Sequence, residues 1–155
     1  MKKLLSSTEV NLWFDSTERP FKFESPFNNE EFAVLHVAAD SNISSREQAW
    51  VSKRLVASRC RYAVCMGYES STWDDSIDYA YIESDPNYEP PDDRFIMTTW
   101  HDGEPIEDVV NFFRWNTIFD DFVPKNFLVL FIGRAEEFET RTLDALKYSF
   151  REVDD

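Results

Sequence analysis

Glycine is scarce in this chain of 155 residues, which contains only three. Gly67, Gly103 and Gly133 are too far apart to form the G-x-G-x-x-G fingerprint of dinucleotide-binding folds or the phosphate-cradling G-x-x-x-x-G-K-[ST] loop. A G-x-S-x-G elbow is also missing, which argues against a serine hydrolase. The sequence therefore lacks the common nucleotide-binding motifs, and we expect no cofactor.

The sequence also lacks signs of secretion or of membrane insertion. Cys60 and Cys65 are the only cysteines, and on one extended strand they would point to opposite faces, where they cannot bridge. Residues 1–5 begin with basic side chains, but the chain turns polar at Ser6 and lacks the apolar stretch of a signal peptide. No apolar run approaches the roughly 18 residues of a membrane-spanning helix. We expect a reduced, cytoplasmic protein with no membrane partner.

Basic residues are missing from a long central stretch. Between Tyr62 and Asp93 there are nine acidic residues and no lysine or arginine. Arg94 then interrupts, and four more acids follow before Arg114; the formal net charge of the chain is −14. Charge of one sign attracts basic partners and repels phosphates, so we expect no nucleic acid and no anionic membrane surface as partner. Solubility is the alternative reason for such charge.

What the chain does contain is a regular alternation of strand and helix patterns. Its content of 43% hydrophobic and 16% aromatic residues is typical of a folded domain. Ser44 and Glu47 have the spacing of a capping box at the start of a helix. A helix is expected from residue 71, but residues 78–82 could form an extended segment instead. Apolar runs predict strands at 32–38, 62–66, 95–100 and 127–132, and helical spacing predicts helices over 46–58, from 71, after Pro105 and over 136–150.

This alternation predicts one α/β domain over residues 1–155. The expected architecture is a three-layer sandwich, with a mostly parallel central sheet of about four strands and helices on both faces. We expect residues 1–30 to form an N-terminal arm or an edge strand. The sequence does not indicate strand order or oligomeric state.

Aromatic residues are interleaved with the acids of the central stretch. Tyrosine and tryptophan are enriched at interface centres, and complementary charge speeds encounter with a partner. The alternative for the individual rings is that they pack a helix onto the sheet. We predict a binding surface for a basic protein, formed by Glu69, Trp73, Asp74, Asp75, Asp78, Tyr81, Glu83, Asp85 and Tyr88.

A second candidate site lies at the carboxyl ends of the predicted strands, where open parallel sheets bind ligands. The residues that follow these strands include Asp40, Glu69, His101 and Asp102. A histidine among carboxylates can act as an acid or base or can bind a metal. Asp102 serves equally well as a turn former or helix cap, and the adjacent acids of the chain do not match a calcium loop. We therefore assign no catalytic residue and no metal.

In size, acidity and lack of catalytic motifs, the chain resembles immunity proteins and antitoxin-like inhibitors. The resemblance concerns these bulk properties and no motif. A compact acidic domain can occupy the basic substrate channel of a nuclease toxin. The sequence therefore favours a non-enzymatic inhibitor of bacterial type that neutralises a basic toxin, with a small enzyme or ligand-binding domain at the strand ends as the alternative.

Overall fold

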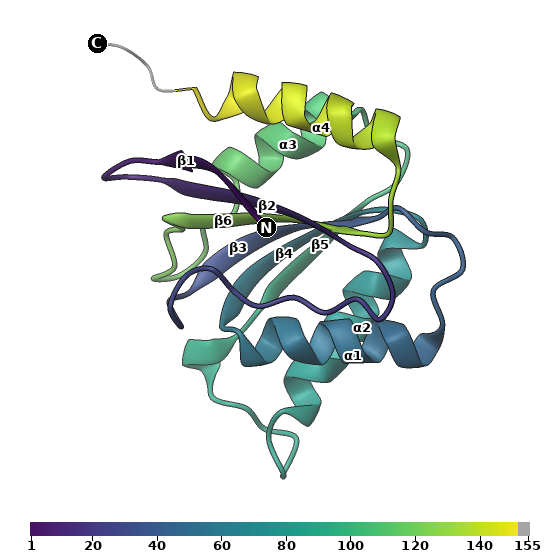
Figure 1. Ribbon diagram of the computed structural model, residues 1–155. Coiled ribbons are helices and arrows are strands. Elements are labelled where there is room, and N and C mark those ends of the chain that lie inside the picture. The colour runs from purple at the N-terminus through teal and green to yellow at the C-terminus, as the bar shows by residue number, and fades with distance from the viewer. Residues whose placement is uncertain (152–155) are drawn as a thin grey trace.

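The chain folds around one six-stranded sheet and four α-helices, in a computed structural model that describes residues 1–151 (Figure 1). The strands are β1 (Lys2–Ser6), β2 (Asn11–Thr17), β3 (Phe32–Ala38), β4 (Cys60–Gly67), β5 (Met97–His101) and β6 (Asn126–Ile132). The helices are α1 (Ser45–Ala57), α2 (Ser70–Glu83), α3 (Ile106–Trp115) and α4 (Glu136–Ser149), with a short 3-10 helix at Asp92–Arg94.

The sheet is mostly parallel, as predicted, but it is larger than the predicted four strands. Its order is β1-β2-β6-β3-β4-β5, and β1 is the strand that runs antiparallel to its neighbour. Both additional strands come from the first 17 residues. β1 lies at the edge, whereas β2 lies inside the sheet and pairs along its full length with β6. β2 carries polar residues such as Asp15, and its pairing partner is distant in sequence, so local pattern did not predict it.

Local signals account for most of the other elements. The Ser44 hydroxyl accepts a hydrogen bond from the Glu47 amide at 3.2 Å, and the Glu47 carboxylate accepts one from the Ser44 amide at 3.0 Å. This is the predicted capping box, and it begins α1. α2 is helical from Ser70 to Glu83, so the extended alternative for residues 78–82 is wrong.

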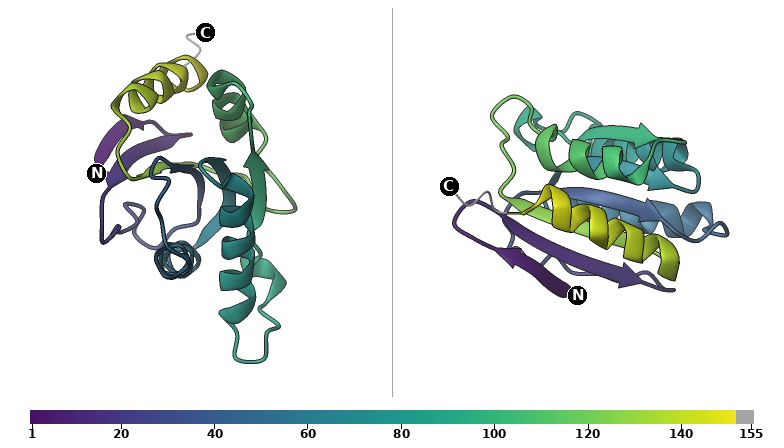
Figure 2. Two further views of the ribbon diagram at one scale, coloured as in Figure 1. Left: turned by 90° about the vertical axis from the view of Figure 1, so that its right-hand side faces the viewer. Right: turned by 90° about the horizontal axis from the view of Figure 1, so that it is seen from above.

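Helices cover both faces of the sheet (Figures 1 and 2). α3 and α4 lie side by side on one face, and their apolar residues join one core cluster with alternate residues of the strands. α1 and α2 join a second cluster on the opposite face. The segment between β2 and β3 adds three buried rings to this second cluster, those of Phe21, Phe23 and Phe27.

The two cysteines are free and buried, but the prediction that they point to opposite faces is wrong. Cys60 and Cys65 belong to the same cluster on the α1/α2 face. The pairing of β4 with β3 shifts register between Phe32 and Ala33, which breaks the simple alternation along β4. Burial raises the pKa of the Cys60 thiol to about 12, so this thiol is inert.

None of the helices within residues 1–151 is long and apolar enough to cross a membrane.

Candidate functional site

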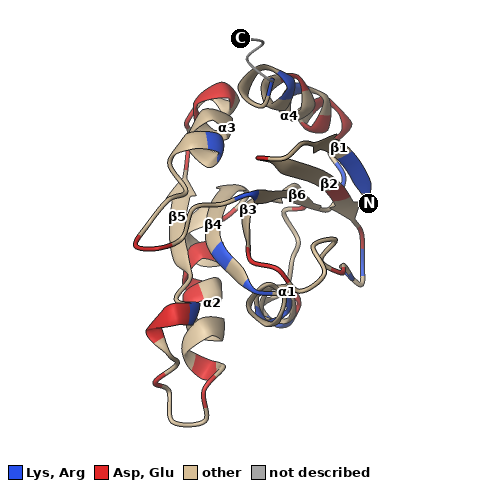
Figure 3. Cartoon of the chain, turned by 90° about the vertical axis from the view of Figure 1, so that its left-hand side faces the viewer, with Lys and Arg blue, Asp and Glu red and all other residues tan. Residues whose placement is uncertain are grey.

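α2 is the centre of the acidic surface. Its fourteen residues include four acids and no lysine or arginine. The absence of basic residues continues through the segment after the helix as far as Arg94, and Figure 3 shows the acids along both parts. Within residues 1–151, no ion pair involves Asp74, Asp75 or Asp78. The acidic charge of α2 is therefore not neutralised inside the protein.

A tight connection places α2 against the sheet. Gly67 has φ +90°, and a Cβ atom there would lie 2.3 Å from the carbonyl oxygen of Ala38. Only glycine fits this position, because any side chain would meet the backbone of β3. Glu69 then adopts a left-handed conformation with φ 52°, and the helix begins at Ser70. The chain thus reverses within three residues, which sets α2 over β4 and β5.

The predicted binding residues divide into two groups according to helical phase. Trp73, Ile77 and Tyr81 repeat at four-residue spacing and face the core. The Trp73 ring packs on His36 with 4.1 Å between centroids, and the Tyr81 hydroxyl donates to the carbonyl of Pro91 at 2.9 Å. Asp74 is also buried. Trp73, Asp74 and Tyr81 therefore support α2 from beneath, and a partner cannot reach the two rings without moving the helix.

The remaining predicted residues lie at the surface. Glu69, Asp75, Glu83 and Tyr88 are exposed, and Asp78 and Asp85 are partly exposed. Three further exposed rings were missing from the predicted set: Tyr68 in the turn before α2, Tyr79 on α2 and Trp100 on β5. A helical period counted from the apolar residues of α2 would have assigned Tyr79 to the outer side. The exposed position of Trp100 depends on strand order, which the sequence does not indicate.

Asp74 and Asp78 share one hydroxyl group. The Thr98 Oγ1 atom lies 3.1 Å from an Asp74 oxygen and 2.8 Å from an Asp78 oxygen. A hydroxyl has one hydrogen, so both contacts are hydrogen bonds only when one carboxyl group also holds a proton. Desolvation, followed by the charge of Asp78, raises the pKa of Asp74 to about 6. The pKa of Asp78 is raised too, first by desolvation. This pair holds a proton more readily than ordinary aspartates do.

Three carboxylates of α2 lie close enough together to resemble a metal site. Ligand oxygens of Asp74, Asp75 and Asp78 lie within 4.8 Å of one another. Ca²⁺ and Mg²⁺ require about six oxygen ligands, and these three residues offer one ligand atom each. Because the Thr98 hydroxyl already contacts two of the three, we assign no metal to this cluster.

β5 borders the acidic helix and ends the sheet. It pairs with β4 only, and within residues 1–151 no backbone hydrogen bond is made on its outer side. Thr98 points to α2, where it contacts Asp74 and Asp78. Trp100 follows two residues later on the same side of the strand and is 54% exposed. The open strand edge, the unpaired acids and an exposed indole thus occur together.

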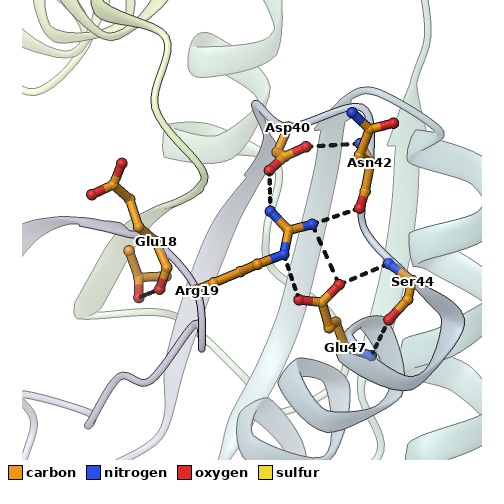
Figure 4. Close-up of polar contacts among 7 residues, drawn as sticks. Glu18, Arg19, Asp40, Asn42, Ser44 and Glu47 are labelled. Carbon is orange, nitrogen blue, oxygen red and sulfur yellow. Dashed lines mark hydrogen bonds and ion pairs between the residues drawn. The ribbon is translucent and has the colours of Figure 1, made fainter.

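The alternative site at the carboxyl ends of the strands has its own structure (Figure 4). Arg19, directly after β2, donates to Asp40 at 2.8 Å, pairs with Glu47 at 2.8 Å and donates to the Asn42 carbonyl. The Asn42 amide, followed by Arg19, lowers the pKa of Asp40. A Cβ atom on Gly133 would lie 2.7 Å from that of Asp40, so β6 ends against it. Open α/β sheets bind ligands at this end of their strands. In this protein the Asp40 carboxylate at that end already accepts hydrogen bonds from Arg19 and the Asn42 amide.

The other members of this alternative site are not joined to Asp40. His101 faces α3: its ring lies 4.8 Å from Phe112, and its nitrogens contact Thr99 at 3.0 Å and Glu104 at 2.8 Å. Glu69 and Asp102 are exposed. Within residues 1–151, no hydrogen bond or ion pair connects any two of the four predicted residues. The structure thus does not bring them together as a hydrogen-bonded constellation. Sequence reasoning missed Arg19, because it missed the strand before it.

A cleft of about 1190 Å³ lies at the opposite, amino-terminal end of the strands. Arg59 and Arg61 approach Glu31 there at 3.2 and 2.8 Å, so two of the three arginines in its lining already have an acidic partner. The lining also includes two pairs of adjacent acids, Asp92 with Asp93 and Asp120 with Asp121. The cleft therefore extends the acidic surface beyond the end of α2.

Fold and surface together define an α/β domain with a mostly parallel sheet and an unneutralised acidic helix beside one sheet edge. The chain belongs to the family described as domain of unknown function (DUF7684), whose model matches residues 10–148. No curated protein matches this sequence. The family match covers β2 to nearly the end of α4, and hence the acidic helix, the open edge and Arg19.

Proposed function

We propose that this chain is a three-layer α/β sandwich that acts as a non-enzymatic, acidic protein-binding domain. Its partner is a basic protein, which it neutralises in the manner of a bacterial immunity protein or antitoxin-like inhibitor in the cytoplasm. A toxin with a basic substrate channel, such as a nuclease, has the complementary chemistry. The recognition surface consists of the outer side of α2, the segment that follows it and the β5 edge.

The observation that carries this proposal is the unneutralised charge of α2. Asp75 and Glu83 are exposed on its outer side, and Tyr79 stands between them along the helix. Charges that have no partner inside the protein remain available to steer a basic partner, which raises association rates about 10- to 1000-fold. Exposed tyrosines supply the rigid contact area that interface centres favour.

A charge-matched pair of variants tests the proposal. Asp75→Asn with Glu83→Gln removes two charges from α2, whereas Glu137→Gln with Asp144→Asn removes two exposed charges from α4. The unmodified protein first captures a basic protein from the lysate of its own organism at low salt. Stopped-flow association of that purified partner is then measured with each variant at about 0.05 M and about 0.5 M salt.

We expect the α2 variant to associate at least about threefold more slowly at low salt and the α4 variant to associate nearly as the unmodified protein does. High salt should remove the difference, because it screens exposed charges. Equal effects of the two variants would contradict recognition by α2, and failure to retain any basic protein would contradict the proposed function.

The alternative function is a ligand-binding domain or small enzyme at the carboxyl ends of the strands. The position of Asp40 and Glu69 after β3 and β4, and of His101 as the last residue of β5, supports it, because these parallel strands are adjacent. The contacts of Asp40 with Arg19 and of His101 with Glu104 weigh against it, because both groups already have partners. Arg19→Ala frees Asp40 and separates the two functions: it should alter small-molecule binding in the alternative, and should leave association with a basic protein unchanged in our proposal.

A further inference from the structure

The two edges of the sheet differ in how they are protected from pairing. β1 carries two exposed lysines, Lys2 and Lys3, and its register with β2 shifts between Lys3 and Leu5. Edge strands commonly use lysines and irregular register to prevent the addition of another chain. β5, with the sequence Met-Thr-Thr-Trp-His, has no lysine, proline, acid or register shift in its pairing with β4. The β5 edge is therefore a ready template for one more strand.

The surroundings of β5 define which chain fits this template. A strand that adds to β5 places alternate side chains on the α2 side of the sheet. There they meet Thr98, Trp100 and the carboxyl groups of Asp74 and Asp78, which contact Thr98 but form no ion pair within residues 1–151. A basic side chain at this point would supply a positive charge that no residue of the described part of the chain brings to these two carboxyl groups. Its aliphatic stem would lie on the exposed indole of Trp100.

We infer that β5 accepts an extended segment of the basic partner as an additional strand, with an arginine or lysine of that segment beside Asp78 and Asp74. This inference rests on the proposed function and assigns the mode of binding. The occupant is a basic segment and not a second copy of the chain. Pairing two β5 edges would bring two acidic helices and two bodies of net charge −14 together.

Two synthetic peptides separate backbone pairing from charge attraction. The first is a ten-residue peptide of alternating arginine and threonine. The second has the same sequence but is N-methylated at every residue, so it keeps the charge and loses the N–H groups that a strand donates. Hydrogen–deuterium exchange of the amides of Met97–His101 is followed with each peptide, and binding is measured by isothermal titration calorimetry.

We expect the unmethylated peptide to bind more tightly and to slow exchange of β5 amides at least about tenfold, with no such protection by the methylated peptide. Equal binding of both peptides without protection of β5 would overturn the inference and leave recognition of basic proteins standing. Binding of neither peptide would count against both proposals. Protection of β5 in the free protein that grows with its concentration would show a second copy as the occupant and also overturn the inference.

Matched variants test the side chains. Trp100 and Trp115 are 54% and 55% exposed, so Trp115→Ala, which removes the indole on α3, is the control for Trp100→Ala. Asp74→Asn with Asp78→Asn is compared with Glu107→Gln and Asp108→Asn on α3, which changes the charge equally. The variants at Trp100 and at Asp74 with Asp78 should weaken the unmethylated peptide at least about tenfold. If the α3 controls weaken it as much, the edge has no specific role and the inference fails.

Discussion

The two faces of the sheet are covered in the same way by a pair of helices, but their interiors differ. On the α3/α4 face the core consists of apolar side chains with many stacked rings, such as Phe113 on Phe127 at 5.3 Å. The partly buried Arg114 on that face lies over three rings, which offset its charge. On the α1/α2 face the buried side chains include His36, Cys65 and Asp74.

The two faces therefore contribute differently: one stabilises the fold, and the other lies next to the proposed recognition surface. Within residues 1–151, the two His36 nitrogens are buried without a hydrogen-bond partner, and Asp74 has no basic partner. Both arrangements cost free energy of folding. Among the residues that the structure describes, the α3/α4 face has one buried nitrogen without a hydrogen-bond partner, Arg114 Nε, which lies over aromatic rings. The α1/α2 face keeps the two His36 nitrogens without a hydrogen-bond partner and Asp74 without a basic one, next to the acidic surface. Changes on the two faces should therefore affect stability in opposite directions.

The largest effect should come from Phe113→Ala on the α3/α4 face. The Phe113 side chain is fully buried and contacts the rings of Phe127 and Phe150. Truncation leaves a cavity and should lower the free energy of unfolding by about 3–5 kcal/mol, measured by urea denaturation followed by circular dichroism. Tyr79→Ala on α2 is the control, since this exposed ring should change stability by less than about 0.5 kcal/mol. A similar loss in both variants would contradict the comparison.

The second effect, which is confined to acidic pH, should come from His36→Leu on the α1/α2 face. Desolvation lowers the pKa of His36 to about 3. The unfolded chain takes up this proton near pH 6.5 and the folded one does not, so stability falls by about 1.4 kcal/mol per pH unit as pH falls from 6.5 toward 3. His36→Leu should remove this slope, in denaturation curves recorded from pH 4 to 8. A variant that keeps the slope of the unmodified protein would contradict the assignment to His36.

The smallest effect should come from Asp74→Asn, and it has the opposite pH dependence. Because the folded pKa of Asp74 is raised to about 6, stability from this group is greatest below pH 4 and is lost as pH rises through 6. The asparagine supplies a permanent donor toward Thr98 and Asp78, and should raise the free energy of unfolding at pH 8 by about 1 kcal/mol.

Asp144→Asn on α4 removes an exposed charge and serves as the control for this change. It should leave the pH dependence between 4 and 8 as it is. If Asp74→Asn is instead less stable than the unmodified protein at pH 8, burial of the Asp74 carboxyl group does not cost the free energy of folding assigned to it here.

Much of the fold could be predicted because its signals are local. The capping box of Ser44 and Glu47 and the apolar run of β6 predict elements within a residue or two of their observed bounds. Residues 1–30 were expected to form an arm or an edge strand, but the place of β2 inside the sheet depends on its pairing with β6, which is distant in sequence. Cys60 was assigned to the wrong face because a register shift depends on the neighbouring strand.

The candidate surface was predictable in charge but not in detail. The order of charged residues along the chain is enough to show the acidic stretch between Glu69 and Asp93. Which residues of α2 are buried depends on the side of the helix that faces the sheet. That side carries Trp73 and Asp74. The open edge at β5 depends on strand order. Arg19 gains its role from residues of the β3–α1 loop, which are close in space but not adjacent in sequence.

Strand order also bears on how the protein is made on the ribosome. β6 lies between β2 and β3 in the sheet, yet it is the last of the six strands to be synthesised. Until residue 132 has left the exit tunnel, β2 and β3 have a gap between them, and β1 with β2 can form only an isolated hairpin, which is barely stable in water. β3, β4 and β5 emerge earlier, so β4 can pair with β3 and β5 before β6 is made. The acidic helix α2 thus leaves the ribosome before β6 completes the sheet.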